Sequence, residues 1–179
     1  MKIYVNQIGA NENKLSMNFP GVYNLLVPTD KYNFAYQPFE KLDKVGILIT
    51  IFIFVILAFI VLYKKIEFNK ESIITVGLVS VIIATFFLPH MHDRYLYIGD
   101  ILAILYLFCQ KNKFYIPITI ELISLYAYSC CLFGNNGIPI QIVSLVFFVV
   151  LIILLKELYI KYFKNDANIL VISDGQKQK

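Results

Sequence analysis

Both histidines and the only arginine of this 179-residue chain fall within five residues, from His90 to Arg94, between two long apolar runs. With Asp93, this segment offers imidazole, carboxylate and guanidinium groups. Ionisable groups at the edge of a bilayer carry a desolvation cost that a purely structural loop need not bear. We therefore predict that this segment is the functional centre of the protein.

Arg94 is suited to binding a phosphate, because a guanidinium presents paired N–H donors that the point charge of a lysine lacks. The alternatives are an internal ion pair with Asp93 or Asp100, or contact with lipid head groups. His90 and His92 are expected to hydrogen-bond a ligand, or else to cap the neighbouring helix. The same residues could hold a divalent cation, but H-x-H-D has no specific metal-ligand spacing, so no metal or other cofactor is predicted.

Residues 89–100 resemble a motif of a known family. They read Pro-His-Met-His-Asp-Arg-Tyr and, after four further residues, Asp100. This is similar to the P-x-M-H-E-R-Y-x-x-x-x-D motif near the C-terminal end of bacterial GT-C superfamily members, mannosyltransferase-like membrane glycosyltransferases that use polyprenyl-phosphate sugars. Asp93 stands where the family more often has glutamate. Residues 15–23 are similar to the L-S-x-N-x-P-x-x-Y segment that precedes the motif in that family.

The resemblance implies an inverting transfer of a sugar from a polyprenyl-phosphate donor on the external face of the membrane. It implies that the donor is bound by His90, His92, Arg94, Tyr95 and Asp100. In the mechanism that it implies, an acid activates the acceptor hydroxyl while cationic groups stabilise the leaving phosphate. In the family this acid lies in the first external loop, near the N-terminus of the full protein. No catalytic residue is therefore assigned in this chain, in which Asp93 is at most a stand-in.

The composition is that of a polytopic membrane protein. Hydrophobic residues make up 59% of the chain, and the mean hydropathy is +0.69. Apolar runs predict an all-α bundle of about five transmembrane helices, at residues 45–63, 73–88, 95–109, 114–133 and 138–155. Three regions are expected: extracytoplasmic loops with one short helix at 1–43, a transmembrane bundle at 44–164 and a cytoplasmic tail at 165–179.

The lysines predict the orientation of the chain and bear on its partners. The loops after the first, third and fifth predicted spans contain eight lysines, whereas the two intervening loops contain Arg94 alone. By the positive-inside rule, the lysine-rich side and the C-terminus are cytoplasmic, which places residues 1–43 and 89–94 outside the plasma membrane. The net charge of +4 comes from scattered lysines without a basic run, so nucleic acid is not an expected partner.

The N-terminal segment shows no signal peptide that would lead it across the membrane. We therefore expect it to be an external loop that follows helices of a larger or split protein. The expected partners are membrane lipids, the lipid-linked sugar donor and a chain that supplies the missing N-terminal helices.

The three cysteines, Cys109, Cys130 and Cys131, lie in or beside apolar runs. None has metal-ligand spacing with another ligand, so we expect buried packing residues. The adjacent pair at 130 and 131 leaves a vicinal disulfide as an alternative.

The predicted function is thus the C-terminal membrane module of a GT-C-type glycosyltransferase that is incomplete for catalysis alone. The alternative is a small membrane transporter or lipid-flipping accessory subunit. In that case Asp100 and Glu121, the two acids within predicted spans, would relay protons or bind a cationic solute. A third reading is a gene fragment without activity.

Overall fold

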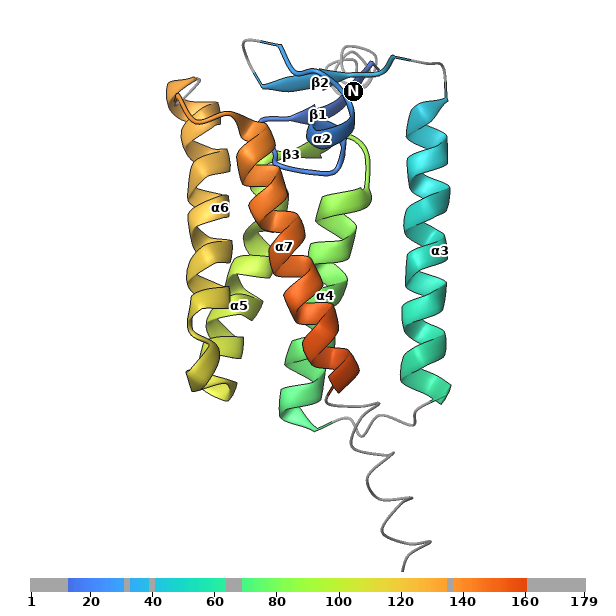
Figure 1. Ribbon diagram of the computed structural model, residues 1–179, viewed down its shortest axis with the longest axis vertical. Helices are drawn as coiled ribbons and strands as arrows, with labels where there is room; N and C mark the ends of the chain where they lie inside the picture. The colour runs from blue at the N-terminus through green and yellow to red at the C-terminus, as the bar shows by residue number, and fades with distance from the viewer. Residues whose placement is uncertain (1–12, 31–32, 39–40, 64–68, 135–136, 161–179) are drawn as a thin grey trace, which may run out of the picture.

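The computed structural model describes residues 13–30, 33–38, 41–63, 69–134 and 137–160. Helices form an upright bundle, and three short strands lie together at one end of it, which we call the sheet end (Figure 1). The helices are α2 (Tyr23–Leu26), α3 (Leu42–Tyr63), α4 (Lys70–Phe87), α5 (Tyr97–Cys109), α6 (Tyr115–Phe133) and α7 (Ile140–Tyr159). The strands are β1 (Lys14–Met17), β2 (Phe34–Tyr36) and β3 (Met91–His92). The prediction of an all-α polytopic membrane protein is confirmed.

Four of the helices, α3, α4, α6 and α7, are long and apolar enough to cross a membrane. The third predicted span, 95–109, instead divides into a 3₁₀ turn, η1 (Asp93–Leu96), and the 13-residue helix α5. At 1.5 Å per residue α5 extends about 20 Å, which is less than the hydrocarbon thickness of about 30 Å. It packs between α4 and α6 and still leads the chain away from the sheet end (Figure 1).

Local sequence explains where α4 and α6 begin or end. The Asn69 side chain caps α4 by accepting a hydrogen bond from the Ser72 amide at 2.8 Å. The helix ends at Phe87 because Leu88 precedes Pro89, and a residue before proline favours the extended backbone that Leu88 adopts, with ψ 138°. Helix α6 ends at Gly134, whose φ of +82° favours glycine.

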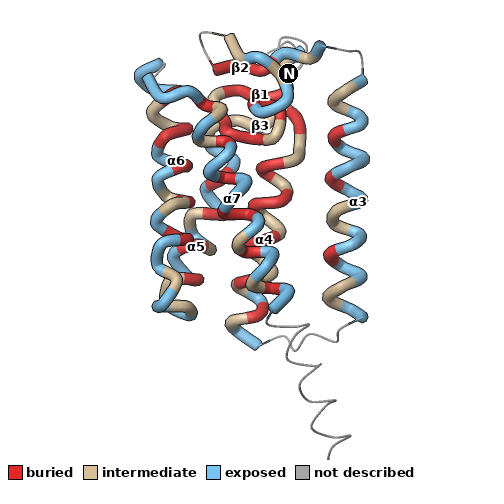
Figure 2. Tube along the Cα trace, viewed as in Figure 1, coloured by how far each residue is buried: buried red, intermediate tan, exposed pale blue. Residues whose placement is uncertain are grey.

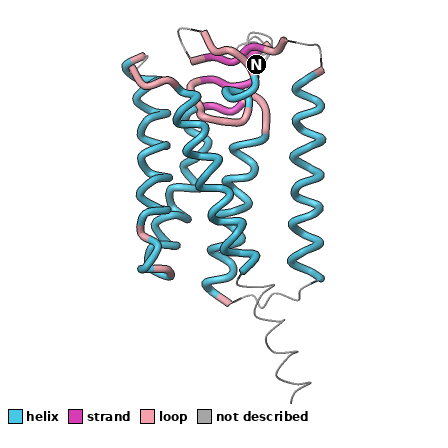
Figure 3. Tube along the Cα trace, viewed as in Figure 1, coloured by secondary structure: helices cyan, strands magenta, loops and turns pink. Residues whose placement is uncertain are grey.

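The strands form a sheet in the order β2-β1-β3 (Figure 3). Strand β1 pairs antiparallel with β2 and parallel with β3, where Ser16 lies opposite Met91 and Met17 opposite His92. The expected short helix of residues 1–43 is present as α2, but the sheet was not predicted. Its strands are only two to four residues long, which is too short for a recognisable alternation of apolar and polar residues. Strands β1 and β3 are also far apart in the sequence, so local sequence does not predict their pairing. The predicted tail at 165–179 lies outside the described residues.

Buried aromatic rings anchor the N-terminal segment on the bundle. Phe19 is fully buried, and its ring centroid lies 6.1 Å from that of Phe147 in α7. The Phe147 ring in turn meets Phe86 of α4 edge to face at 5.6 Å. Edge-to-face pairs at such distances are favourable beyond the apolar area that they bury. Helix α3, by contrast, is mostly exposed and stands at one side of the bundle (Figure 2).

Candidate functional site

The two segments that resemble the GT-C motifs form one structural unit at the sheet end. Besides the β1–β3 pairing, the amide of His90 donates to the carbonyl of Leu15 at 2.7 Å. The amide of Val22 donates to the carbonyl of Phe86 at 2.9 Å, and the Tyr23 hydroxyl donates to that of Phe87 at 3.0 Å. Backbone groups therefore hold residues 15–23 against the end of α4 and the segment that follows it.

The Tyr23 hydroxyl is buried beside α3. Burial, reinforced by the negative charge of Asp43, raises the pKa of Tyr23 to about 12. The hydroxyl therefore remains a hydrogen-bond donor across the physiological pH range. A Cβ atom placed at Gly46 of α3 would clash with the Tyr23 hydroxyl oxygen, so a larger residue at this contact requires the buried Tyr23 ring to shift.

His90 connects the parts of the sheet end. Its Nδ1 lies 2.7 Å from the carbonyl oxygen of Lys14, so this nitrogen carries a hydrogen and donates it. Its Nε2 faces Asp43 at the start of α3, 3.9 Å from Oδ2. The backbone at His90 has a φ of +61°, which is uncommon for a residue other than glycine. Both ring nitrogens thus face protein groups, which favours a structural role over the predicted contact with a ligand.

His92 faces a mixed but mainly positive environment. Burial lowers the pKa of His92, and the positive charge of Arg94 lowers it further. Lys14 and His90 act in the same direction, whereas the carboxylate of Asp93 opposes them. The ring stacks edge to face on Tyr95 with centroids 5.5 Å apart. These surroundings therefore favour the neutral form of His92, and their positive charges would attract an anion.

Arg94 is exposed, as is Tyr95. Within the described part of the chain, its guanidinium makes no hydrogen bond and has no carboxylate at ion-pair distance. The alternative of an internal pair with Asp93 or Asp100 is therefore not realised. A guanidinium left unpaired at the end of a membrane bundle is free to bind an anion or a lipid head group.

Asp93 and Asp100 face residues of α6. Asp93 interacts with the thiol of Cys131, and Asp100 Oδ2 accepts a hydrogen bond from the Ser124 hydroxyl at 2.7 Å. Glu121 lies close enough to Asp100 for the two carboxyl groups to interact. Asp100 is thus a partner of α6 and does not meet Arg94.

Asp100 in α5 and Glu121 in α6 are each incompletely hydrogen-bonded. Asp100 Oδ1 and Glu121 Oε1 are buried and have no hydrogen-bond partner in the part of the chain that the structure describes. Groups of this kind inside a membrane bundle are costly, which marks them as candidates for function.

The cysteines are all free, and the prediction of buried packing residues is right for Cys130 alone. Cys109 and Cys131 are exposed, and each lies near the C-terminal end of its helix. Among the described residues, no group of three or more His, Cys, Asp or Glu side chains could hold a metal ion.

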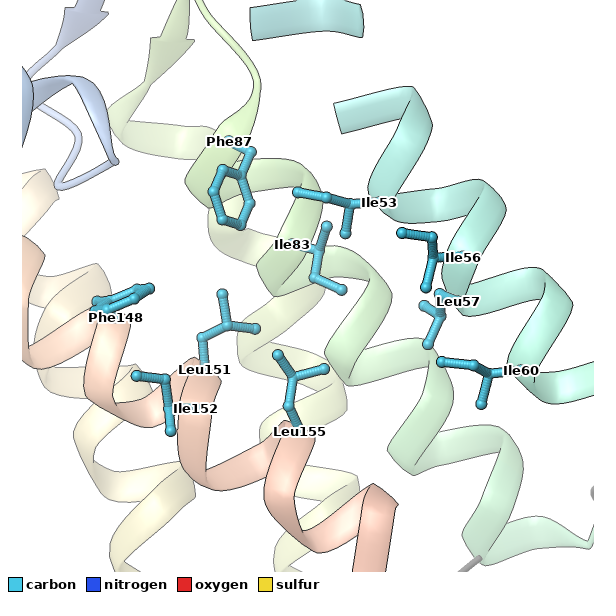
Figure 4. A pocket seen from close by; sticks show the side chains of 10 residues that line it. All are labelled: Ile53, Ile56, Leu57, Ile60, Ile83, Phe87, Phe148, Leu151, Ile152 and Leu155. Atoms are coloured by element: carbon cyan, nitrogen blue, oxygen red, sulfur yellow. The ribbon is translucent and has the colours of Figure 1, made fainter. Parts of the chain in front are cut away.

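An apolar cavity of about 290 Å³ lies between α3, α4 and α7 (Figure 4). Only apolar side chains line it, among them Ile53, Ile60, Ile83, Phe87, Leu151 and Leu155. It offers no donor to a phosphate or a sugar, so it is separate in chemistry from the polar site at the sheet end.

Two residues lie at the site although the sequence did not predict them there. Lys14 directly precedes the segment 15–23, and Asp43 opens α3, but nothing in their local sequence relates them to His90 or His92. The only signal was proximity of Lys14 to the first of the two motif-like segments. Strand pairing, which local sequence does not reveal, brings it to the site.

Fold and site together define an all-α polytopic membrane protein with an exposed arginine and a neutral histidine at one end of its bundle. No family model matches the sequence, and no curated protein or solved structure matches it significantly.

Proposed function

We propose that the chain is the C-terminal membrane module of a GT-C-type glycosyltransferase, and that its sheet end binds the phosphate of a polyprenyl-phosphate sugar. The observation that supports this most is the joining of the two motif-like segments by the parallel β1–β3 pair. If the two segments resembled the family motifs by chance, there would be no reason for them to pair with each other in the fold.

Arg94 is the principal phosphate ligand in this proposal, because its guanidinium has no partner among the described residues. His92 and Tyr95 lie beside it and contribute a hydrogen bond and an aromatic surface to the sugar-phosphate. His90 shapes the loop through its bond to Lys14.

The module is incomplete for catalysis alone in this proposal. The described carboxylates near the site face other parts of the protein: Asp93 interacts with Cys131, Asp43 faces His90, and Asp100 faces α6, where its Oδ2 accepts a hydrogen bond from Ser124. A general base needs a carboxylate free to reach the acceptor hydroxyl. We assign that base to a partner chain or segment.

The sheet end faces the exterior of the plasma membrane in this proposal. Lys70, Lys111, Lys113 and Lys156 lie at or near the opposite ends of their helices, in the short loops that the positive-inside rule weighs most. Lys14, Lys41 and Lys44 lie at the sheet end, so the orientation depends on the loops between the spans. The predicted loop lysines at 64, 65, 161 and 164 lie outside the described residues.

Binding of a polyprenyl-phosphate sugar to the detergent-purified chain, followed by native mass spectrometry, tests the proposal. Arg94→Ala should weaken binding about tenfold to a hundredfold, since hydrogen bonds to charged groups contribute about 1.5–3 kcal/mol. Arg94→Lys should restore only part of the affinity, because it loses the bidentate geometry. Lys111→Ala, which removes an exposed charge at the opposite end, is the matched control. Equal binding by Arg94→Ala and wild type would refute the assignment.

A second candidate function is transport of protons or a cationic solute. The buried and unpartnered oxygens of Asp100 and Glu121 favour it, because acids inside a membrane bundle commonly serve such pathways. Absence of donor binding to the wild-type chain would move this candidate ahead.

A further inference from the structure

We propose that Lys14 and His92 complete the phosphate site at Arg94, and that His92 takes up one proton when the site binds a lipid-linked phosphodiester. This inference deepens the proposed function and rests on it. It concerns Lys14, which directly precedes the first motif-like segment, and His92 and Arg94 of the second.

Strand pairing places Lys14 beside the loop after α4. Met17 of β1 lies opposite His92 of β3, and the Lys14 carbonyl accepts the hydrogen bond from His90 at 2.7 Å. Lys14 is thereby fixed by its backbone beside the loop that carries His92 and Arg94. Its ammonium lies 4.5 Å from the centroid of the Phe34 ring, with no carboxylate of the described residues at ion-pair distance. Lys14 and Arg94, which come from distant parts of the sequence, both act electrostatically on His92.

Charged groups from three segments act on His92. The groups that act on it are Arg94 and Asp93 from η1, Lys14 from β1 and His90 from the preceding loop. Burial and the cations outweigh Asp93, so the pKa of His92 is lowered in the free protein. An anion placed among Lys14, His92 and Arg94 would offset the positive charges and favour the imidazolium.

The consequence is a link between binding and pH. The pKa of His92 lies below its usual value in the free protein and rises when the anion is bound. Between these two pKa values the complex holds one proton more than its separate components. Affinity therefore increases as pH falls through this window, by at most about tenfold per pH unit for one proton.

The experiment measures affinity of the full chain in detergent for a short-chain polyprenyl-phosphate sugar at pH 5.5, 6.5 and 7.5, by isothermal titration calorimetry. A phosphodiester has no second ionisation near neutrality, unlike a phosphomonoester, so the ligand itself keeps one charge. Buffers of different ionisation enthalpy count the protons taken up. The uncharged polyprenol serves as the ligand control.

Wild type should bind more tightly at pH 5.5 than at pH 7.5 and take up a proton, whereas His92→Gln should show a flat profile. Lys14→Met should weaken binding about tenfold, as expected for loss of one charged contact, and Lys14→Arg should restore it. Methionine keeps the aliphatic stem over Phe34, and a thermal melt verifies folding. Lys44→Met is the matched control, because Lys44 is exposed on α3 and does not act on His92.

Donor binding that depends on Arg94 but not on Lys14, or that keeps its pH dependence in His92→Gln, would overturn the inference and leave the proposed function intact. The same pH dependence with polyprenol would also overturn it, since the effect would not come from the phosphate. Failure of the wild-type chain to bind the donor at any pH would overturn both.

Discussion

The Nδ1 atom of His90 lies 2.7 Å from the carbonyl oxygen of Lys14, 76 positions earlier in the chain. This bond joins the start of β1 to the loop after α4, so the sheet end acts as one body. The same ring faces Asp43 at the start of α3. One side chain therefore links three segments, so its replacement should weaken the packing of all three.

His90→Ala should lower the free energy of unfolding by about 1–3 kcal/mol, because it removes the hydrogen bond to Lys14 and because alanine adopts a φ of +61° less readily than histidine. His90→Asn should lose less, since asparagine tolerates this backbone conformation and can donate to Lys14. Thermal unfolding in detergent compares the two variants. Equal stability of the alanine variant and wild type would contradict the structural role of His90.

Gly46→Ala should destabilise the bundle by about 1–3 kcal/mol, because the added Cβ would displace the Tyr23 hydroxyl from Phe87. Gly77 of α4 is the matched control: a Cβ there would meet Leu102 at 3.7 Å, an ordinary contact. Gly77→Ala should be neutral or stabilise by up to about 1 kcal/mol through helix propensity. Thermal melts in one detergent measure the pair. A stabilising Gly46→Ala would show that α3 does not pack closely on Tyr23.

The stability of the protein should decrease on mild acidification through His92. Its pKa is lowered in the folded chain by burial and by Arg94, so the unfolded chain binds the proton more readily. The free energy of unfolding contributed by neutral His92 is present above the unfolded pKa of about 6.5 and decreases as pH falls below it. Denaturation of wild type and His92→Gln from pH 7.5 to 5.5 isolates this effect as the difference between them. A larger pH dependence in the glutamine variant would show the opposite sign.

Two native cysteines report the orientation of the chain. Cys131 is exposed near the sheet end of α6, and Cys109 is exposed at the far end of α5. A membrane-impermeant maleimide added to intact cells should label Cys131 and spare Cys109 if the sheet end is external. Cys131→Ala and Cys109→Ala assign the signal. Labelling of Cys109 alone would reverse the proposed orientation.

Glu121→Gln should leave binding of the sugar donor unchanged, because Glu121 interacts with Asp100 within the span, whereas donor binding is assigned to Arg94 at the sheet end. Under the transport alternative, the same substitution should abolish proton flux driven by a membrane potential. Proteoliposomes with an enclosed pH-sensitive dye measure that flux, and Glu157→Gln, outside the Asp100 cluster, controls for general damage. Flux that depends on Glu121 would favour the transporter.

The Glu157→Gln control could itself affect folding, because Glu157 has partners. It accepts a hydrogen bond from the Tyr106 hydroxyl at 2.5 Å and pairs with Lys113 at 3.1 Å. Gln110 similarly donates to Glu71. These bonds fasten α5 to α7 and α4 at the end opposite the sheet, so folding of the Glu157→Gln variant must be verified before its flux is interpreted.

The sequence by itself determined the membrane class and most of the span boundaries. A long uncharged run such as 45–63 can hydrogen-bond its backbone groups within a bilayer only as a helix. Composition and length therefore determine that such a run forms a membrane helix. Proline and glycine mark the ends at Leu88 and Gly134 for equally local reasons. The clustering of His90 to Arg94 was likewise visible without a structure.

Only the tertiary structure decided which of these polar residues have partners. The chemically similar His90 and His92 differ because one reaches Lys14 and Asp43 while the other faces Arg94 and Tyr95. Arg94 remains free of described carboxylates, and Asp100 meets Ser124, although sequence allowed these two to pair with each other. Whether a segment forms a membrane helix depends on its own residues. Which polar groups become hydrogen-bonded partners depends on how distant segments of the chain pack together.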